Sequence, residues 1–325
     1  MPSPLYILMS INLLISILIL FSSNSMFSMW LALEILTISF ITLMFTKNNQ
    51  EIAEGCMIYF LPQALSSSMF IFLLAFPSIL IYTKMFFSIM IISMAIKLGM
   101  APFHQWFPIV AKKCPLNINI ILMTIMKLPP FIILSSSFLA TPLSIILILS
   151  SAIIGSLGGF NQNNLKALMA FSSISHMAWI YISLSNEKNI WLIYLILYSM
   201  IITSIFFILM PNTFLLNQMF SKNFVYKNLV VFLLLSLSGL PPLTGFFQKW
   251  LVISLNINSP MILILIGSSI INIMFYLRLT YPFLLSFSLK SYWLSDSKLS
   301  PMKFILALKS VFLLPFALLL YTLFV

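Results

Sequence analysis

The chain begins with MPSPLYILMSINLLISILILF (residues 1–21), a run that contains no charged side chain. A membrane-spanning helix needs about 20 predominantly apolar residues, so this run is long enough to cross a bilayer. It lacks the basic region and the small-residue cleavage site of a signal peptide, and it is not an Arg-rich amphipathic transit sequence. We therefore interpret it as a retained first transmembrane helix.

The rest of the sequence has the same apolar character. Of the 325 residues, 62% are hydrophobic and only 6% are charged, whereas an average soluble domain has roughly 25% charged residues. The 16 Lys and Arg residues and 5 Asp and Glu residues are too few to give a globule of this length a hydrated surface. This composition excludes a water-soluble fold and predicts an all-α, polytopic membrane helix bundle.

Apolar runs separated by polar, Pro or Gly residues predict about eleven transmembrane helices. They are expected near residues 3–21, 26–46, 56–80, 85–101, 117–138, 142–160, 165–185, 189–210, 228–251, 259–284 and 304–325. The clearest breaks are expected at residues 47–55, 102–117 and 291–298. No change in composition marks a second domain, so we expect one transmembrane domain over residues 1–325.

The lysines between these runs predict the topology. If the helices alternate across the membrane, only Lys84 and Lys188 lie on one side and nine lysines lie on the other. The nine are Lys47, Lys112, Lys113, Lys166, Lys222, Lys227, Lys290, Lys298 and Lys303. Because basic residues gather on the inner side, we expect an inner N-terminus and an outer C-terminus. Charges scattered in this way argue against nucleic-acid binding despite the net charge of +11.

Ionisable residues inside the expected helices form the candidate site. Glu34 lies near the middle of the second helix, where a carboxylate costs several kcal/mol unless it is neutralised or paired. Lys97 lies just before Gly99 and Pro102, two residues that weaken a helix. A buried amine beside a broken helix is typical of an ion path. The alternatives are a structural ion pair for Glu34, and a Lys97 that extends to the lipid headgroups from a helix that simply ends.

Two further lysines also lie beside residues that interrupt a helix. Lys249 follows LSLSGLPPLTGFF, in which Gly239 and Pro242 have the same separation as the Gly and Pro of the first break. Such matching breaks indicate an internal repeat with sites at the breaks. Lys127 precedes the prolines at 129–130, which free backbone carbonyls that could hold water beside its amine.

The two histidines are candidate proton relays, because histidine titrates near neutral pH. His104 lies just past the first break, and His176 shares a helix face with Ser172, Ser173 and Trp179. A hydrogen-bonded packing role is the alternative for both. No third ligand at metal spacing accompanies them, and the two cysteines form no CxxC pair, so we expect no metal site and no iron–sulfur cluster. No GxGxxG or P-loop pattern suggests a nucleotide site.

One intramembrane acid and three intramembrane lysines are the minimum set of groups for a proton path. A change in the separation of Glu34 and Lys97 would switch the lysine between holding and releasing a proton. The energy must come from a partner, because this chain encodes no redox centre. Two alternatives stay open, namely an independent cation/proton antiporter and a membrane scaffold whose buried charges only pack.

Four motifs together resemble the NADH dehydrogenase subunit 2 family, mitochondrially encoded core membrane subunits of respiratory complex I. They are WLALEIL around Glu34, MAIKLGMAPFHQWFP around Lys97, GSLGGFNQNNLKALMAFSSISHMAW around His176 and LLSLSGLPPLTGFFQKW around Lys249. The resemblance implies an antiporter-like fold with two broken helices. It also implies inverted repeats near residues 1–138 and 142–285, followed by a C-terminal helix near 304–325.

The resemblance further implies that the chain pumps protons across the mitochondrial inner membrane while NADH reduces ubiquinone elsewhere in the complex. In the family, the glutamate at Glu34 pairs with the lysine at Lys97, Lys127 is the central lysine, and Lys249 is the exit-side lysine. The resemblance also implies that the N-terminus lies in the matrix and the C-terminus in the intermembrane space. The implied partners are other membrane-arm subunits and lipid. FMN, iron–sulfur clusters, NADH and ubiquinone would belong to the complex, with no cofactor in this chain.

Overall fold

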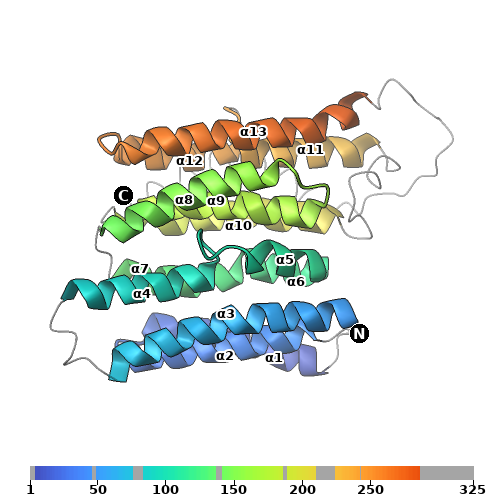
Figure 1. Cartoon of the computed structure of the whole chain (residues 1–325). Helices are drawn as coiled ribbons and strands as arrows, with labels where there is room; N and C mark the ends of the chain where they lie inside the picture. Colours follow the sequence, from blue (N-terminus) through green and yellow to red (C-terminus); the bar gives the residue numbers. More distant parts are fainter. Residues whose placement is uncertain are drawn as a thin grey trace. The chain divides into compact units, whose positions relative to one another are not determined.

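A computed structural model describes residues 4–45, 49–75, 83–136, 141–185, 189–209, 224–241 and 243–285. In these ranges the chain forms helices α1 to α13 and one short 3₁₀ helix, η1, and it forms no strand (Figure 1). The all-α fold predicted from composition is therefore confirmed. The segment at 291–298 and the helix expected at 304–325 lie outside the described residues.

The chain divides into two compact units, Met1–Ser151 and Ala152–Val325. The first unit contains α1 (Pro4–Ser22), α2 (Met26–Met44), α3 (Gln50–Ala75), α4 (Thr83–Leu98), α5 (Trp106–Lys113), α6 (Leu116–Met123), η1 (Ile125–Lys127) and α7 (Leu128–Ser136). Helix α8 (Pro142–Gly159) passes from the first unit into the second. The second unit continues with α9 (Leu165–Ser183), α10 (Ile190–Leu209), α11 (Phe224–Ser238), α12 (Thr244–Leu255) and α13 (Met261–Leu285).

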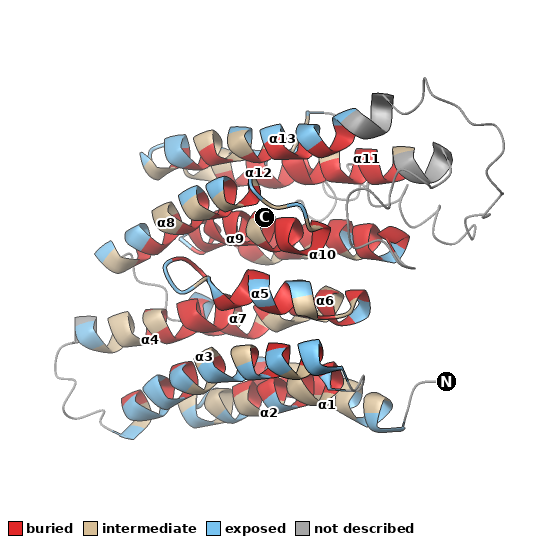
Figure 2. Ribbon diagram, turned by 45° about the vertical axis from the view of Figure 1, so that its right-hand side comes forward, coloured by how far each residue is buried: buried red, intermediate tan, exposed pale blue. Residues whose placement is uncertain are grey.

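In the first unit, α2 packs against α1 and α3, and α3 also contacts α4 and α5 (Figure 1). Helix α1 buries only Leu13, Ser16 and Leu20, and most of its other side chains are apolar and exposed (Figure 2). A contiguous apolar surface of this kind is stable only against lipid or a partner protein. The exposed face of α1 therefore fits a membrane environment.

In the second unit, α9 is buried along nearly its whole length (Figure 2). It contacts α10, α12 and α13. Helix α8 approaches α9 so closely that a Cβ atom on Gly155 would lie 2.5 Å from the backbone nitrogen of Ser175. Small residues allow such close contact between membrane helices. The centre of this unit is therefore α9.

Seven helical segments in the described part of the chain are long and apolar enough to cross a membrane, one of which combines α6, η1 and α7. They are Pro4–Ser22, Met26–Met44, Gln50–Ala75, Leu116–Ser136, Pro142–Gly159, Ile190–Leu209 and Met261–Tyr281. Shorter apolar helices occur at Met85–Leu98 and Asn228–Ser238. The chain is thus a multi-pass membrane protein, whereas the expected total of eleven spans stays a prediction.

Two segments that were expected to be breaks contain helix. Helix α3 begins at Gln50, inside the loop expected at 47–55, and Glu51 in its first turn suits the positive end of the helix dipole. Helix α5 occupies the middle of the segment 102–117. Its Pro108 lies in the first turn, where a missing N–H is tolerated, and tertiary packing buries all of its apolar side chains except that of Ile109.

Lys166, one of the nine lysines expected on the inner side, is buried at the start of α9, the helix expected at 165–185. The side chain of Asn164 caps this helix by accepting a hydrogen bond from the Lys166 backbone N–H at 3.0 Å. The cap begins the helix immediately before the lysine and so draws it into the packed unit.

Candidate functional site

The structure brings Glu34 of α2 and Lys97 of α4 together. Lys97 Nζ lies 4.0 Å from Glu34 Oε1, with the lysine side chain 3% exposed and the glutamate side chain 29% exposed. Neither of these two atoms has a hydrogen-bond partner among the described residues. The pair is therefore an ion pair whose groups attract each other without direct contact, an arrangement that a small shift of either helix can tighten or loosen.

The position of Lys97 follows from the way α4 ends. Gly99, two residues later, has a φ of +67°, in the left-handed region that favours glycine. A Cβ atom there would also lie 3.0 Å from Cβ of Phe107. Two side chains donate to the last carbonyls of the helix, Trp106 to Ile96 at 3.2 Å and Gln63 to Lys97 at 3.4 Å. The end of α4 is thus fixed by α3 and α5, and Lys97 is fixed with it.

The second break has the same backbone structure as the first. Gly239 has a φ of +88° and follows the last residue of α11. In both breaks the glycine N–H and the next N–H donate back into the last helical turn, which is the Schellman motif. The bonds run from Gly99 to Ile96, Met100 to Ala95, Gly239 to Ser236 and Leu240 to Leu235, at 3.1, 3.0, 3.1 and 3.4 Å respectively. The predicted correspondence between the breaks therefore holds at its glycines, while Pro242 lies outside the described residues.

Lys249 relates to its break differently from Lys97. It lies on α12, beyond the break, and its Nζ donates a 2.6 Å hydrogen bond back to the carbonyl oxygen of Ser238. Its side chain is buried, at 6% exposure for the residue. The C-terminal end of a helix carries partial negative charge, which favours an ammonium group. The end of α11 therefore binds the amine that the next helix supplies.

Lys127 lies at the end of η1, between α6 and α7, and is 2% exposed. Its Nζ lies 5.5 Å from the centre of the Phe107 ring, within the range of a cation–π contact. Pro130 has no N–H to donate to the carbonyl of Met126, four residues earlier. The helix expected at 117–138 is therefore interrupted at Lys127. The interruption leaves the carbonyl oxygen of Met126, next to Lys127, without its usual helical donor.

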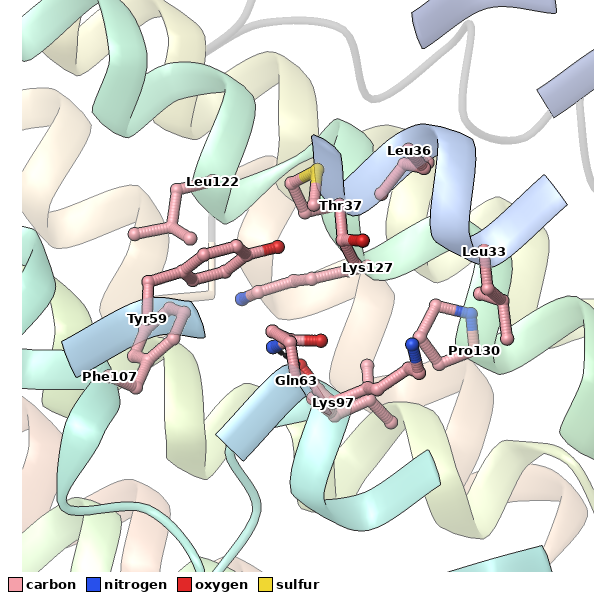
Figure 3. Close-up of a pocket in the computed structure, with 12 residues that line it drawn as sticks. Leu33, Leu36, Thr37, Tyr59, Gln63, Lys97, Phe107, Leu122, Lys127 and Pro130 are labelled. Carbon is pink, nitrogen blue, oxygen red and sulfur yellow. Dashed lines mark hydrogen bonds between the residues drawn. The ribbon is translucent and has the colours of Figure 1, made fainter. Parts of the chain in front are cut away.

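Lys97 and Lys127 line one small cavity of about 20 Å³. In this lysine cavity their amino groups point in different directions, that of Lys127 toward Tyr59 and Phe107 and that of Lys97 toward Pro130 (Figure 3). The remaining lining residues are Leu33, Leu36, Thr37, Gln63, Leu98, Leu122 and Met126. A cavity of this size holds about one water molecule, provided that polar partners are present.

The two histidines have different surroundings. His176 is buried on α9, and its Nδ1 forms a 2.8 Å hydrogen bond with the hydroxyl of Tyr194 on α10. The Tyr198 ring centre lies 5.1 Å from the His176 ring centre. His104 lies in the turn before α5, where its Nδ1 is 3.2 Å from the carbonyl oxygen of Pro102. His104 is absent from the lining of the lysine cavity, whereas His176 lies in a polar part of the second unit.

Sequence reasoning missed several residues around these groups. The serines expected beside His176 donate to backbone carbonyls of their own helix, as Ser172 does to Met169 at 2.9 Å. The histidine instead bonds Tyr194, which with Tyr198 has the i, i+4 spacing of one helix face. Tyr59 and Gln63 on α3 have the same spacing and line the lysine cavity. Polar residues at i, i+4 in an apolar helix are the signal that could have found both pairs.

Comparison with known proteins gives consistent results. Residues 23–275 match the family model described as NADH:quinone oxidoreductase/Mrp antiporter, transmembrane. NADH-ubiquinone oxidoreductase chain 2 of Anopheles gambiae is 39% identical over 305 residues, 88% of each chain. The chain 2 protein of Bos taurus is 32% identical over 295 residues, 85% of each chain.

Solved structures show the same fold. A chain of respiratory complex I from Thermus thermophilus with bound aureothin superposes with a TM-score of 0.80 and 21% identity, covering 94% of this chain and 76% of that one. A chain of the membrane-bound sulfane sulfur reductase, an archaeal respiratory membrane complex, has a TM-score of 0.76 and 15% identity, covering 95% and 73%. The antiporter-like membrane fold expected from the sequence is thus confirmed.

Proposed function

Because this chain belongs to the NADH-ubiquinone oxidoreductase chain 2 family, we propose that it translocates protons as a membrane-arm subunit of that enzyme. The observation that carries this proposal is the buried Glu34–Lys97 ion pair beside a cavity that Lys127 also lines. Three ionisable groups on three helices are assembled here in an apolar interior, where each has a free-energy cost that packing alone does not explain.

The Glu34–Lys97 pair has the right energy scale for a pump. Moving one charge across 150–200 mV costs about 3.5 to 4.6 kcal/mol. Two unit charges 4 Å apart attract by about 4 kcal/mol at an effective dielectric constant of 20. Making and breaking this one pair therefore changes the proton affinity of Lys97 by about the amount that pumping requires.

The proposed path has two ends. A proton held on Lys97 is released when Glu34 moves away, and it passes to Lys127 across the lysine cavity. Lys249, bound to the end of α11, is the proposed exit-side group. His176 is a proposed relay through its bond to Tyr194. His104, in the turn before α5, is the second proposed relay.

The proposal assigns electron transfer to partner subunits. The sequence of this chain offers no nucleotide motif and no cysteine set for a cluster, so NADH, FMN, iron–sulfur clusters and ubiquinone would bind elsewhere in the complex. We also propose that the chain lies in the mitochondrial inner membrane among other membrane-arm subunits and lipid. Its N-terminus would face the matrix and its C-terminus the intermembrane space, from the excess of lysines on one side.

Size separation of native membranes tests this assignment. After extraction in mild detergent, this chain should migrate in a very large particle that oxidises NADH. Migration alone, or in a small particle without that activity, would overturn the assignment and make the free cation/proton antiporter the working hypothesis. A free antiporter would also exchange cations for protons when reconstituted alone in liposomes, which the subunit should not do.

A further inference from the structure

The hydroxyl of Tyr59 is buried and has no hydrogen-bond partner in the part of the chain that the structure describes. The residue is only 1% exposed. Leaving a buried hydroxyl unbonded is costly, so such a group normally has a partner, either protein or ordered water. Tyr59 lines the lysine cavity, and its hydroxyl points toward the side where Thr37 and Lys127 lie (Figure 3).

The ring of Tyr59 is held firmly in place. Its centre lies 4.9 Å from that of Phe40 on α2 and 5.6 Å from that of Trp106 on α5. Contacts from two other helices therefore fix the direction in which the hydroxyl points. The cavity beside this fixed hydroxyl, of about 20 Å³, has room for one water molecule, which needs at least one further polar partner.

Two other polar side chains at the cavity, those of Thr37 and Gln63, already donate hydrogen bonds to backbone carbonyls. Thr37 uses its hydroxyl to donate to the carbonyl of Glu34 at 2.9 Å, and Gln63 donates to the carbonyl of Lys97. Lys97 Nζ has no hydrogen-bond partner within the described ranges. The Tyr59 hydroxyl and the Lys97 amine, on two residues that line the cavity, are therefore both available to bond a water molecule, and Lys127 lines the same space.

We propose that the Tyr59 hydroxyl holds a water molecule in the lysine cavity and positions it to carry a proton between Lys97 and Lys127. This inference rests on the proposed function and adds a positioning residue to it. The protonated Lys97 gives a proton to the water, and the water gives one of its own protons to the neutral Lys127 amine. One N–H bond breaks and another forms, the water is unchanged, and the positive charge moves from one lysine to the other.

Tyr59→Phe in the assembled complex tests the proposal, because it removes one oxygen and keeps the ring contacts. Proton translocation and NADH-driven turnover should fall about fivefold to tenfold, the effect of losing one hydrogen bond in the transfer step. The solvent deuterium isotope effect on turnover should rise, because proton transfer becomes slower relative to the other steps. A loss of rigidity alone would leave that isotope effect unchanged. The exposed Tyr281 provides the matched control, Tyr281→Phe, which should alter neither quantity.

A second variant covers the case in which Tyr59→Phe fails to assemble. Leu122→Phe places a larger side chain in the cavity wall and excludes the water while Tyr59 stays, so it should produce the same slowing and the same rise in isotope effect. Normal pumping and a normal isotope effect in either assembled variant would overturn the inference. Lys127→Met distinguishes failure of this inference from failure of the proposed function. If Lys127→Met abolishes pumping while Tyr59→Phe does not, the proposed function holds and only the role of the Tyr59-bound water is wrong.

Discussion

Lys249 Nζ donates a 2.6 Å hydrogen bond to the carbonyl oxygen of Ser238, the residue just before the left-handed Gly239. The break between α11 and α12 therefore creates the partner of the lysine that follows it. A Cβ atom on Gly239 would lie 3.1 Å from both Cδ and Nζ of Lys249. The glycine thus has two roles: it adopts the left-handed conformation of the turn, and its missing side chain leaves space for the Lys249 amine.

Gly239→Ala is expected to lower both stability and pumping. A left-handed conformation costs a non-glycine residue about 1–2 kcal/mol, and the added methyl group presses on the lysine that bonds Ser238. Native gels report the amount of assembled complex, and proton uptake into vesicles reports pumping. Gly267→Ala is the matched control, because nothing lies within 4 Å of a Cβ atom there. Equal effects of the two substitutions would contradict the proposed role of Gly239.

Lys97→Met is expected to abolish pumping by this subunit while the complex still assembles. The substitution keeps the apolar stem and removes the amine that faces Glu34, so no group at this position can hold the proton. Pumping and NADH oxidation measured on the same vesicles distinguish loss of proton transfer from loss of the complex.

Glu54 and Lys113 provide a control for this variant, because they form an exposed ion pair with side chains 67% and 23% exposed. Exposed pairs contribute at most about 1 kcal/mol, so Lys113→Met should leave pumping unchanged. Normal pumping in an assembled Lys97→Met complex would support the alternative that the buried charges only pack.

Tyr194→Phe tests whether the tyrosine–histidine contact serves structure or transfer. It removes the hydroxyl that bonds His176 Nδ1 at 2.8 Å, which is expected to cost about 0.5–1.5 kcal/mol of stability. If His176 relays protons, pumping should fall further than the loss of assembled complex accounts for. The ratio of proton flux to complex amount gives the answer, and an unchanged ratio would make His176 a packing residue.

The sequence predicted the helices and the charged residues of the site better than their surroundings. Glu34 and Lys97 stand out because charge is costly in an apolar run, and their pairing in space bears out the physical argument for a partner. Tyr59 stands out only through its i, i+4 spacing with Gln63, because a single tyrosine in an apolar helix is common. Only the packing of α2, α3 and α5 buries its hydroxyl, which has no hydrogen-bond partner within the described ranges of the chain.

The local breaks were predictable for a similar reason. Gly99 and Gly239 mark two helix ends because glycine readily adopts the left-handed backbone conformation found there. Helix α5 was not expected because its eight residues contain Pro108 and lie between Pro102 and Pro115. Packing of Trp106 and Phe107 against other helices stabilises this helix. Interactions within one turn can be predicted from the sequence, whereas contacts between helices that are distant in the sequence cannot.

A double-mutant cycle on Glu34 and Lys97 separates the stability of the ion pair from its function. Lys97→Met alone leaves a largely buried carboxylate without its cation, and Glu34→Gln alone leaves the buried ammonium without its anion. Removing one partner of a buried pair costs about 3–5 kcal/mol, and partial exposure of Glu34 places this case at the lower end. The double variant removes both charges, so it should resist heat better than Lys97→Met alone while still failing to pump.

Residual NADH oxidation after graded heating of the assembled complex measures the stability of these variants, and vesicle proton uptake measures their function. Strictly additive losses would mean that the two groups do not interact, because coupled neighbours give a non-zero interaction energy. Restored pumping in the double variant would instead mean that the pair holds the fold and that protons travel by another route.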